Sequence, residues 1–137
     1  MKEKYLERTI GLLGEKGYDA IKDKCVAIFG LGGVGGTALE ALMRSGISNF
    51  VIVDFDVVDP SNLNRQILYK EKDIGKIKVN CACEHIKSID DSIKLTSFNK
   101  KVNEESIKEI FTHKIDFIVD AMMIFKEKKL FQKCPKT

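Results

Sequence analysis

A cluster of glycines between residues 30 and 35 is the feature of this sequence best suited to chemistry. It lies between a short apolar run and a helical pattern, the context in which a GxGxxG arrangement indicates a nucleotide site. Gly30 would permit a tight turn, Gly32 would let the backbone approach a phosphate, and Gly35 would let the helix pack closely on the strand. The helix would offer free N–H groups and its positive dipole end to an anion. The pattern, which comprises Gly30, Gly32, Gly33 and Gly35, therefore predicts a phosphate site rather than a turn needed only for packing.

An acidic residue follows at the distance expected for contact with a ribose. Asp54 comes directly after a second apolar run, 19 residues beyond Gly35. A carboxylate at the end of this strand would accept hydrogen bonds from ribose hydroxyls. NAD and ATP sites share these features, so the glycines and Asp54 leave the choice between the two nucleotides open.

Alternating strands and helices must position these residues. Continuous apolar runs are typical of strands buried on both faces, and apolar residues three or four apart are typical of helices. Strands are expected at 25–29, 50–53, 93–98 and 115–119, and residues 60–69 are expected to form loop and short turns. Helices are expected at 3–24, at 34–44, at 76–89, from an N-cap at Asn103 to Phe111, and at 126–133. In the first of these, Leu12 and Leu13 are the expected apolar contacts.

This alternation predicts an α/β fold. Strands joined by crossover helices form parallel βαβ units with right-handed connections. We expect a Rossmann-like doubly wound sheet, of which the chain forms the N-terminal mononucleotide-binding half with about four parallel strands. A length of 137 residues corresponds to a single domain. It would comprise an N-terminal helical segment over 1–24, a βα core over 25–121 and an atypical C-terminal segment over 122–137.

Composition excludes several other classes of protein. The chain is 44% hydrophobic and 31% charged, as in an ordinary globular protein. No apolar run approaches the roughly 20 residues of a membrane span, so no membrane association is expected. Four cysteines are too few for a secreted disulfide scaffold, which favours a cytoplasmic protein. The net charge of +3 comes from lysines in the last dozen residues, which would form either a solvated face or a contact with RNA: Lys126, Lys128, Lys129, Lys133 and Lys136.

Three further elements accompany the glycine turn. A D-x-D element begins at Asp54, an N-x-x-R-Q element begins at Asn62, and a G-x-x-K element begins at Gly75. Together the four elements resemble the ThiF/MoeB/HesA superfamily of ubiquitin-activating-type adenylating enzymes, over about residues 5–121. Within it, the segment 7–24 is most similar to the tRNA threonylcarbamoyladenosine dehydratases. Those enzymes use ATP to cyclise the threonylcarbamoyl group on an adenosine of certain tRNAs.

The resemblance implies a set of roles. The nucleotide would be ATP, with Mg²⁺ as the metal of the family. Arg65 and Lys78 would be catalytic and bring positive charge to the phosphates. Arg8 would reach into the site of a partner protomer, which implies a homodimer. The nucleotide-binding residues would be Gly30, Gly32, Gly33, Gly35, Asp54, Asp56, Asn62, Arg65, Gln66, Lys78 and Asp120.

Two departures from the family pattern bear on activity. The family has an Asp-Ala-x-Asp turn whose second aspartate binds Mg²⁺, but Met123 stands at that position after Asp120. A thioether is a poor ligand for a hard cation, so no residue is assigned to a metal. The Met123 side chain would either face the site or fill a gap in the core. Family members also continue well beyond the position of Thr137, so the chain is expected to be truncated and catalytically impaired.

Other reactive side chains form no recognisable site in the sequence. Cys81 and Cys83 are two apart on a helix and would point in different directions, as ordinary helix residues do. Cys134 is expected to be a packed or surface thiol. His85 and His113 are isolated in the sequence.

The expected function is therefore that of an ATP-binding, carboxylate-activating adenylating domain of the tRNA threonylcarbamoyladenosine dehydratase type. One alternative is an adenylyltransferase of the ThiF/MoeB type that acts on a small sulfur-carrier protein. Another is a non-catalytic nucleotide-binding or dimerising module. An NAD-dependent oxidoreductase is disfavoured because hydride transfer has no use for cations placed at a triphosphate.

Overall fold

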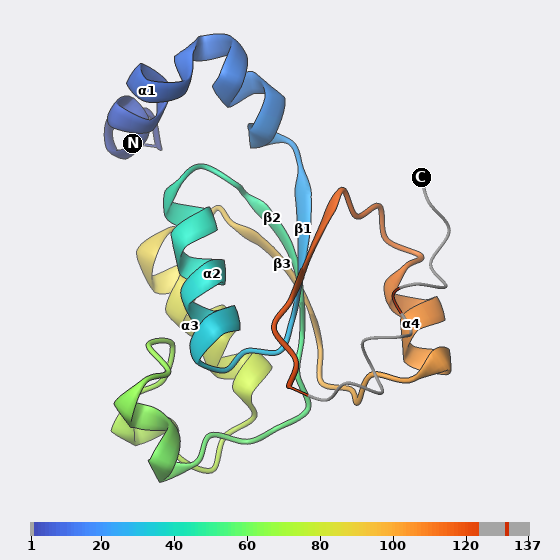
Figure 1. Cartoon of the computed structure of the whole chain (residues 1–137). Helices are drawn as coiled ribbons and strands as arrows, with labels where there is room; N and C mark the ends of the chain where they lie inside the picture. The colour runs from blue at the N-terminus through green and yellow to red at the C-terminus, as the bar shows by residue number, and fades with distance from the viewer. Residues whose placement is uncertain (1, 124–130, 132–137) are drawn as a thin grey trace.

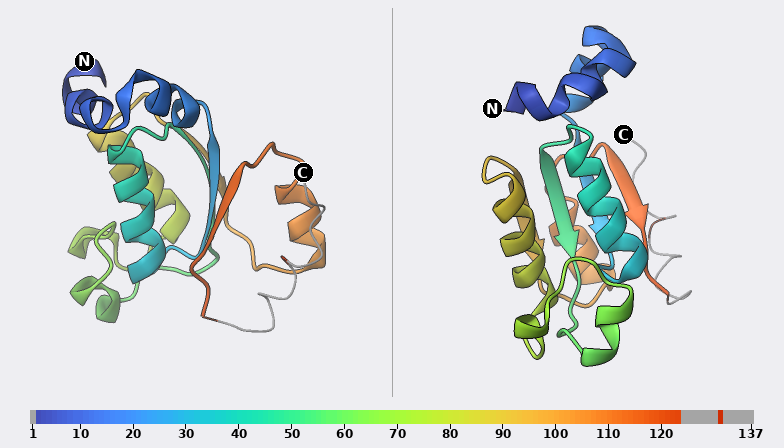
Figure 2. Two further views of the ribbon diagram at one scale, coloured as in Figure 1. Left: turned by 45° about the horizontal axis from the view of Figure 1, so that its top comes forward. Right: turned by 90° about the vertical axis from the view of Figure 1, so that its left-hand side faces the viewer.

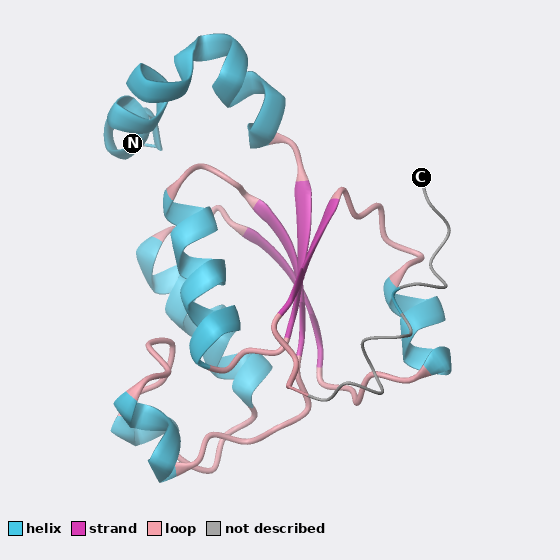
Figure 3. Cartoon of the chain, viewed as in Figure 1, coloured by secondary structure: helices cyan, strands magenta, loops and turns pink. Residues whose placement is uncertain are grey.

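The computed structural model describes residues 2–123 and residue 131, and it shows a parallel sheet between helical layers (Figure 1). The strands β1 (Cys25–Phe29), β2 (Asn49–Val53), β3 (Lys94–Phe98) and β4 (Phe117–Asp120) lie in the order β3-β2-β1-β4, all parallel. The helices α2 (Gly33–Arg44) and α3 (Lys78–Ile89) cover one face, and α4 (Glu104–Ile110) lies on the other (Figure 3). The predicted Rossmann-like fold is confirmed.

The two central strands are buried because both faces of the sheet are covered. In β1 and β2, Val26, Ile28, Phe50 and Ile52 belong to the core beneath α2 and α3. The alternate residues, which include Phe29, belong to the core beneath α4. Side chains alternate between faces along a strand, so a strand in this position needs apolar residues at every place. The strand β3, at one edge, has a mixed and more exposed sequence, as expected.

Helix α3 begins two residues later than predicted, at Lys78 instead of Lys76. The residues around Ile77, which is extended, pair with residues 56–58: the Val58 N–H donates to the Lys76 carbonyl at 2.8 Å, and the Lys78 N–H donates to the Asp56 carbonyl at 3.0 Å. This pairing delays the helix and places Lys78 beside Asp56. The intervening loop forms two short 3-10 helices, Pro60–Asn64 and Glu71–Asp73.

The fourth strand also begins two residues later than the predicted Ile115. Asp116 precedes it and is held against the start of β1, where its carboxylate accepts a hydrogen bond from the Cys25 N–H at 2.8 Å. At the other end of this crossover, the predicted N-cap is confirmed: the Asn103 side chain accepts from the Ser106 N–H. The predicted helix at 126–133, apart from residue 131, lies outside the described residues, as do the lysine cluster and Cys134.

The expected apolar contacts of the first helix are wrong. Helix α1 (Lys2–Lys22) crosses the amino ends of the strands (Figure 2). Leu12 is 85% exposed and Leu13 is 43% exposed, whereas Leu6 is 1% exposed. Gly14 has a φ of 71° and breaks the helical path, so no single helical face runs through the whole segment. Leu6 and Tyr18, on either side of this kink, instead pack over Gly46. None of the described helices is both long enough and apolar enough to cross a membrane.

This arrangement predicts unequal effects for two leucines of α1. Leu6→Ala should lower the free energy of unfolding by about 2–5 kcal/mol, because it leaves a cavity in a closed site. The matched control Leu12→Ala should change it by no more than about 0.5 kcal/mol. Urea denaturation of both variants measures the difference, and an equal loss in the two would contradict the packing of α1 described here.

Candidate functional site: a pocket at the carboxyl ends of the strands

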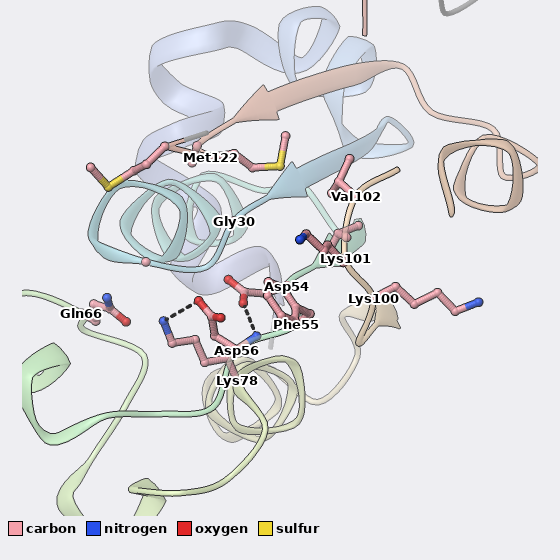
Figure 4. Close-up of a pocket in the computed structure, with 14 residues that line it drawn as sticks. Gly30, Asp54, Phe55, Asp56, Gln66, Lys78, Lys100, Lys101, Val102 and Met122 are labelled. Carbon is pink, nitrogen blue, oxygen red and sulfur yellow. Dashed lines mark hydrogen bonds and ion pairs between the residues drawn. The ribbon is translucent and has the colours of Figure 1, made fainter. Parts of the chain in front are cut away.

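The glycine turn forms one wall of a pocket at the carboxyl ends of the strands (Figure 4). The end of β2, the loop between β3 and α4, and the residues after β4 form other parts of the wall. Ligands of open α/β sheets bind at this edge. The predicted residues that line the pocket are Gly30, Gly32, Asp54, Asp56, Gln66 and Lys78.

The turn and helix α2 approach one another very closely. Gly30 has a φ of 90°, a conformation that favours glycine. A β-carbon on Gly35 would lie 1.7 Å from the Gly30 carbonyl oxygen, so residue 35 has no room for a side chain. The expected roles of Gly30 in the turn and Gly35 in close packing agree with this geometry.

Asp54 holds the glycine turn with one carboxylate oxygen and the segment after β2 with the other. Oδ2 accepts a hydrogen bond from the Leu31 N–H at 2.7 Å, and Oδ1 accepts one from the Asp56 N–H at 2.8 Å. The sequence pattern predicts Asp54 only as a ribose ligand and does not indicate these backbone contacts. Each carboxylate oxygen can accept more than one hydrogen bond, so ribose binding stays a compatible prediction.

Lys78 is a cation held inside the pocket wall. It is only 5% exposed, and its ammonium lies 3.9 Å from Asp56 Oδ2 (Figure 4). Burial of an unpaired charge is costly, so the neighbouring carboxylate helps to retain Lys78 there. The first residue of α3 thus supplies positive charge at the same edge of the sheet as the glycine turn.

Gln66 lies beside the turn with part of its amide unused. It is 6% exposed, its amide nitrogen is near Gly32, and its Oε1 is buried without a hydrogen-bond partner among the described residues. A buried polar atom without a partner is costly. Since the amide can turn either its oxygen or its NH₂ group towards a ligand, this position suits a polar ligand in the pocket.

Asn62 and Arg65 support the neighbouring loop and do not line the pocket. Asn62 Oδ1 accepts a hydrogen bond from the Asp59 N–H at 2.8 Å and closes a 3-10 turn. The Arg65 guanidinium donates to the Ser61 carbonyl at 3.0 Å and to Asn64 Oδ1 at 2.8 Å, while its stem lies near Gly33. Arg65 is exposed and next to the turn, so phosphate contact by this residue stays a prediction.

The segment after β4 carries the departure at Met123. Met123 is 92% exposed and lines the pocket, whereas Met122 packs in part against the core beneath α4. Of the two possibilities for Met123, the structure therefore supports the one in which it faces the site. Asp120 ends β4, and its Oδ1 accepts a hydrogen bond from the Met122 N–H at 3.1 Å.

Several pocket residues were not predicted. Phe55, Lys100 and Lys101 line it, and the Lys101 ammonium lies 6.0 Å from the centre of the Phe55 ring. A signal was available for the lysines, because they follow the third predicted strand and parallel strands end at a common edge. Arg8, in contrast, is exposed on α1, at the amino ends of the strands and away from the pocket.

His85, which is isolated in the sequence, has a partner in the folded chain. His85 Nε2 lies 2.8 Å from Glu40 Oε2, and the Arg44 Nε–H donates to Glu40 Oε1 at 2.8 Å. Burial opposes ionisation of Glu40, but these hydrogen bonds outweigh it and hold the pKa of Glu40 below its usual value. The partners are 45 residues apart in sequence and meet between α2 and α3. Cys81 belongs to the core beneath α2 and α3, and Cys83 packs against that core.

A parallel sheet, a glycine turn at the start of α2 and a buried lysine at the same edge define a Rossmann-like nucleotide-binding class of domain. Residues 6–134 match the model of the ThiF family. The chain belongs to this family.

Named relatives and a solved structure agree with this assignment. The chain is 34% identical over 109 residues to the tRNA threonylcarbamoyladenosine dehydratase of Bacillus subtilis, covering 80% of this chain and 43% of that protein. It is 34% identical over 105 residues to the molybdopterin-synthase adenylyltransferase of Escherichia coli, covering 77% of this chain and 42% of that protein. The structure of the E. coli tRNA N6-threonylcarbamoyladenosine dehydratase in complex with ATP superposes on this chain with a TM-score of 0.88 at 28% identity. The match covers 93% of this chain and 53% of that one. The chain thus spans about half the length of these relatives.

Proposed function

We propose that this chain is an ATP-binding, carboxylate-activating adenylating domain of the tRNA threonylcarbamoyladenosine dehydratase type. The observation that carries the proposal is the buried ammonium of Lys78, which lines the same pocket as the glycine turn. A buried cation beside backbone N–H groups at a helix start suits the phosphates of a nucleotide. The similarity to a dehydratase solved with ATP supports the choice of ATP.

Adenylation joins a carboxylate oxygen to the α-phosphorus of ATP and releases pyrophosphate. The reaction needs positive charge near the phosphates and a fixed in-line arrangement. The glycine turn, Lys78 and Arg65 would supply the positive charge, and Asp54 would hold the ribose. The remaining polar groups proposed for nucleotide contact are Asp56, Asn62, Gln66 and Asp120.

A sulfur-carrier adenylyltransferase is the second candidate. Its support is the molybdopterin-synthase adenylyltransferase of E. coli, which is as similar in sequence as the dehydratase relative. Pyrophosphate exchange stimulated by tRNA or by a sulfur-carrier protein distinguishes the two. Binding of ATP without any exchange would identify a module that only holds the nucleotide.

We further propose a homodimer in which Arg8 acts in trans. Helix α1 lies across the amino ends of the strands, whereas the pocket lies at their carboxyl ends (Figures 1 and 2). Within one chain Arg8 and the pocket are therefore at opposite ends of the sheet, and a second copy would have to bring Arg8 to the phosphates.

The proposal predicts that Lys78→Met weakens ATP binding far more than adenosine binding. A charge-assisted contact contributes about 1.5–3 kcal/mol, so the dissociation constant for ATP should rise by about tenfold or more. The matched control is Lys76→Met, because Lys76 is exposed and pairs with Asp73 away from the pocket. Isothermal titration calorimetry with both ligands measures the effects. Similar losses for ATP and adenosine in Lys78→Met would show that Lys78 acts through folding alone.

The position of Met123 yields a prediction about Mg²⁺. The thioether that faces the pocket does not fit a hard cation, so ATP affinity of the unmodified chain should depend little on Mg²⁺. Met123→Asp should create that dependence, because it adds a carboxylate at an exposed position of the pocket. Met123→Asn is the control, because asparagine has the shape of aspartate but carries no charge. ATP titrations with and without Mg²⁺ test the three proteins, and strong dependence in the unmodified chain would contradict this interpretation.

A further inference from the structure

We propose that Tyr69 is a positioning residue of the nucleotide site, whose hydroxyl holds the glycine turn and whose ring supports the ammonium of Lys78. Tyr69 does not line the pocket, so it would act through the two neighbours that it contacts. The expected effect of Tyr69 on nucleotide affinity rests on the proposed function. The expected effect of Tyr69 on the glycine turn does not, because it concerns the protein without nucleotide.

The hydroxyl of Tyr69 holds one end of the Leu31 peptide unit. It donates a hydrogen bond of 2.6 Å to the Leu31 carbonyl, in a buried position and across 38 residues of sequence. The Leu31 N–H is held by Asp54 Oδ2 at 2.7 Å. Both polar backbone groups of Leu31 are therefore fixed by side chains from outside the turn. Because Leu31 lies between Gly30 and Gly32, these contacts restrict two residues that have no side chains of their own to hold them.

The ring of Tyr69 faces Lys78. The Lys78 ammonium lies 5.7 Å from the ring centre, and its carboxylate neighbour, Asp56, is 3.9 Å away. A cation over an aromatic face is attracted by the ring, most strongly where water is excluded. Lys78 is almost fully buried, so the ring replaces part of the hydration that its ammonium has lost. The same side chain thus contacts both the turn and the cation that are proposed to bind the phosphates.

The surroundings keep Tyr69 in place and in its donor form. Its neighbour Leu68 packs against Gly36 in the first turns of α2, so consecutive residues contact the turn and the helix that follows it. Burial raises the pKa of Tyr69 well above its usual value, and the charges of Asp54 and Asp56 act in the same direction. The hydroxyl therefore stays protonated at ordinary pH and can always donate to Leu31.

The test compares Tyr69→Phe, which removes only the hydroxyl, with Tyr69→Leu, which removes the ring as well. Tyr5→Phe is the control, because it also deletes a hydrogen-bonded hydroxyl: Tyr5 lies on α1, away from the pocket, and donates to Asp90 at 2.7 Å. Hydrogen exchange of residues 30–36 in the nucleotide-free proteins measures restraint of the turn. Calorimetric titration with ATP and with adenosine measures the effect on phosphate binding.

We expect Tyr69→Phe to speed exchange in residues 30–36 and to weaken ATP binding by about tenfold, with adenosine binding changed by less than about twofold. Tyr69→Leu should weaken ATP binding further, since Lys78 also loses its support. Unchanged exchange in a folded Tyr69→Phe protein would overturn the inference, as would the same exchange or binding changes in Tyr5→Phe. Absence of ATP binding by the unmodified chain would instead refute the proposed function. The exchange result would still decide whether Tyr69 holds the turn.

Discussion

Helix α2 can begin directly at the end of β1 because residue 35 has no side chain. A β-carbon at that position would overlap the Gly30 carbonyl, which lies 1.7 Å from where it would stand. Close contact between helix and turn places the first N–H groups of α2 at the carboxyl edge of the sheet. The other pocket residues are arranged around this contact: Asp54 holds the turn from the end of β2, and the pairing of 56–58 with 76–78 brings Lys78 to the same edge. The site therefore depends on backbone packing before it depends on any charged side chain.

Electrostatics then decides which ligands suit the pocket. Asp54 uses both oxygens on backbone N–H groups, one on the turn and one on the segment after β2, so much of its charge is already offset by these contacts. Lys78 is buried, and Asp56 and the Tyr69 ring are its close neighbours. Lys101 adds positive charge at another part of the wall, whereas the Lys100 ammonium is paired with Glu109. An anion with several charges, such as a triphosphate, matches this distribution better than a ligand bound through its ribose alone.

Features encoded locally could be predicted from the sequence. Apolar runs indicated all four strands, and the glycine spacing indicated the turn, because each depends on residues close together in the chain. Features that depend on distant contacts could not. The choice of Leu6 over Leu12 follows from packing on Gly46, the late start of α3 follows from pairing across about 20 residues, and the Glu40–His85 contact joins two helices. The hydrogen bond from Tyr69 to Leu31 belongs to the same group, since nothing near either residue indicates it.

We propose that the turn, Lys78 and the residues that hold them form a site for ATP rather than for a dinucleotide. Competition calorimetry tests this most directly: the unmodified chain is titrated with ATP in the absence and presence of NAD at a comparable concentration. We predict a measurable affinity for ATP that NAD leaves nearly unchanged, because NAD lacks the terminal phosphates that the cations would contact. Displacement of ATP by NAD at equal concentration would contradict the account.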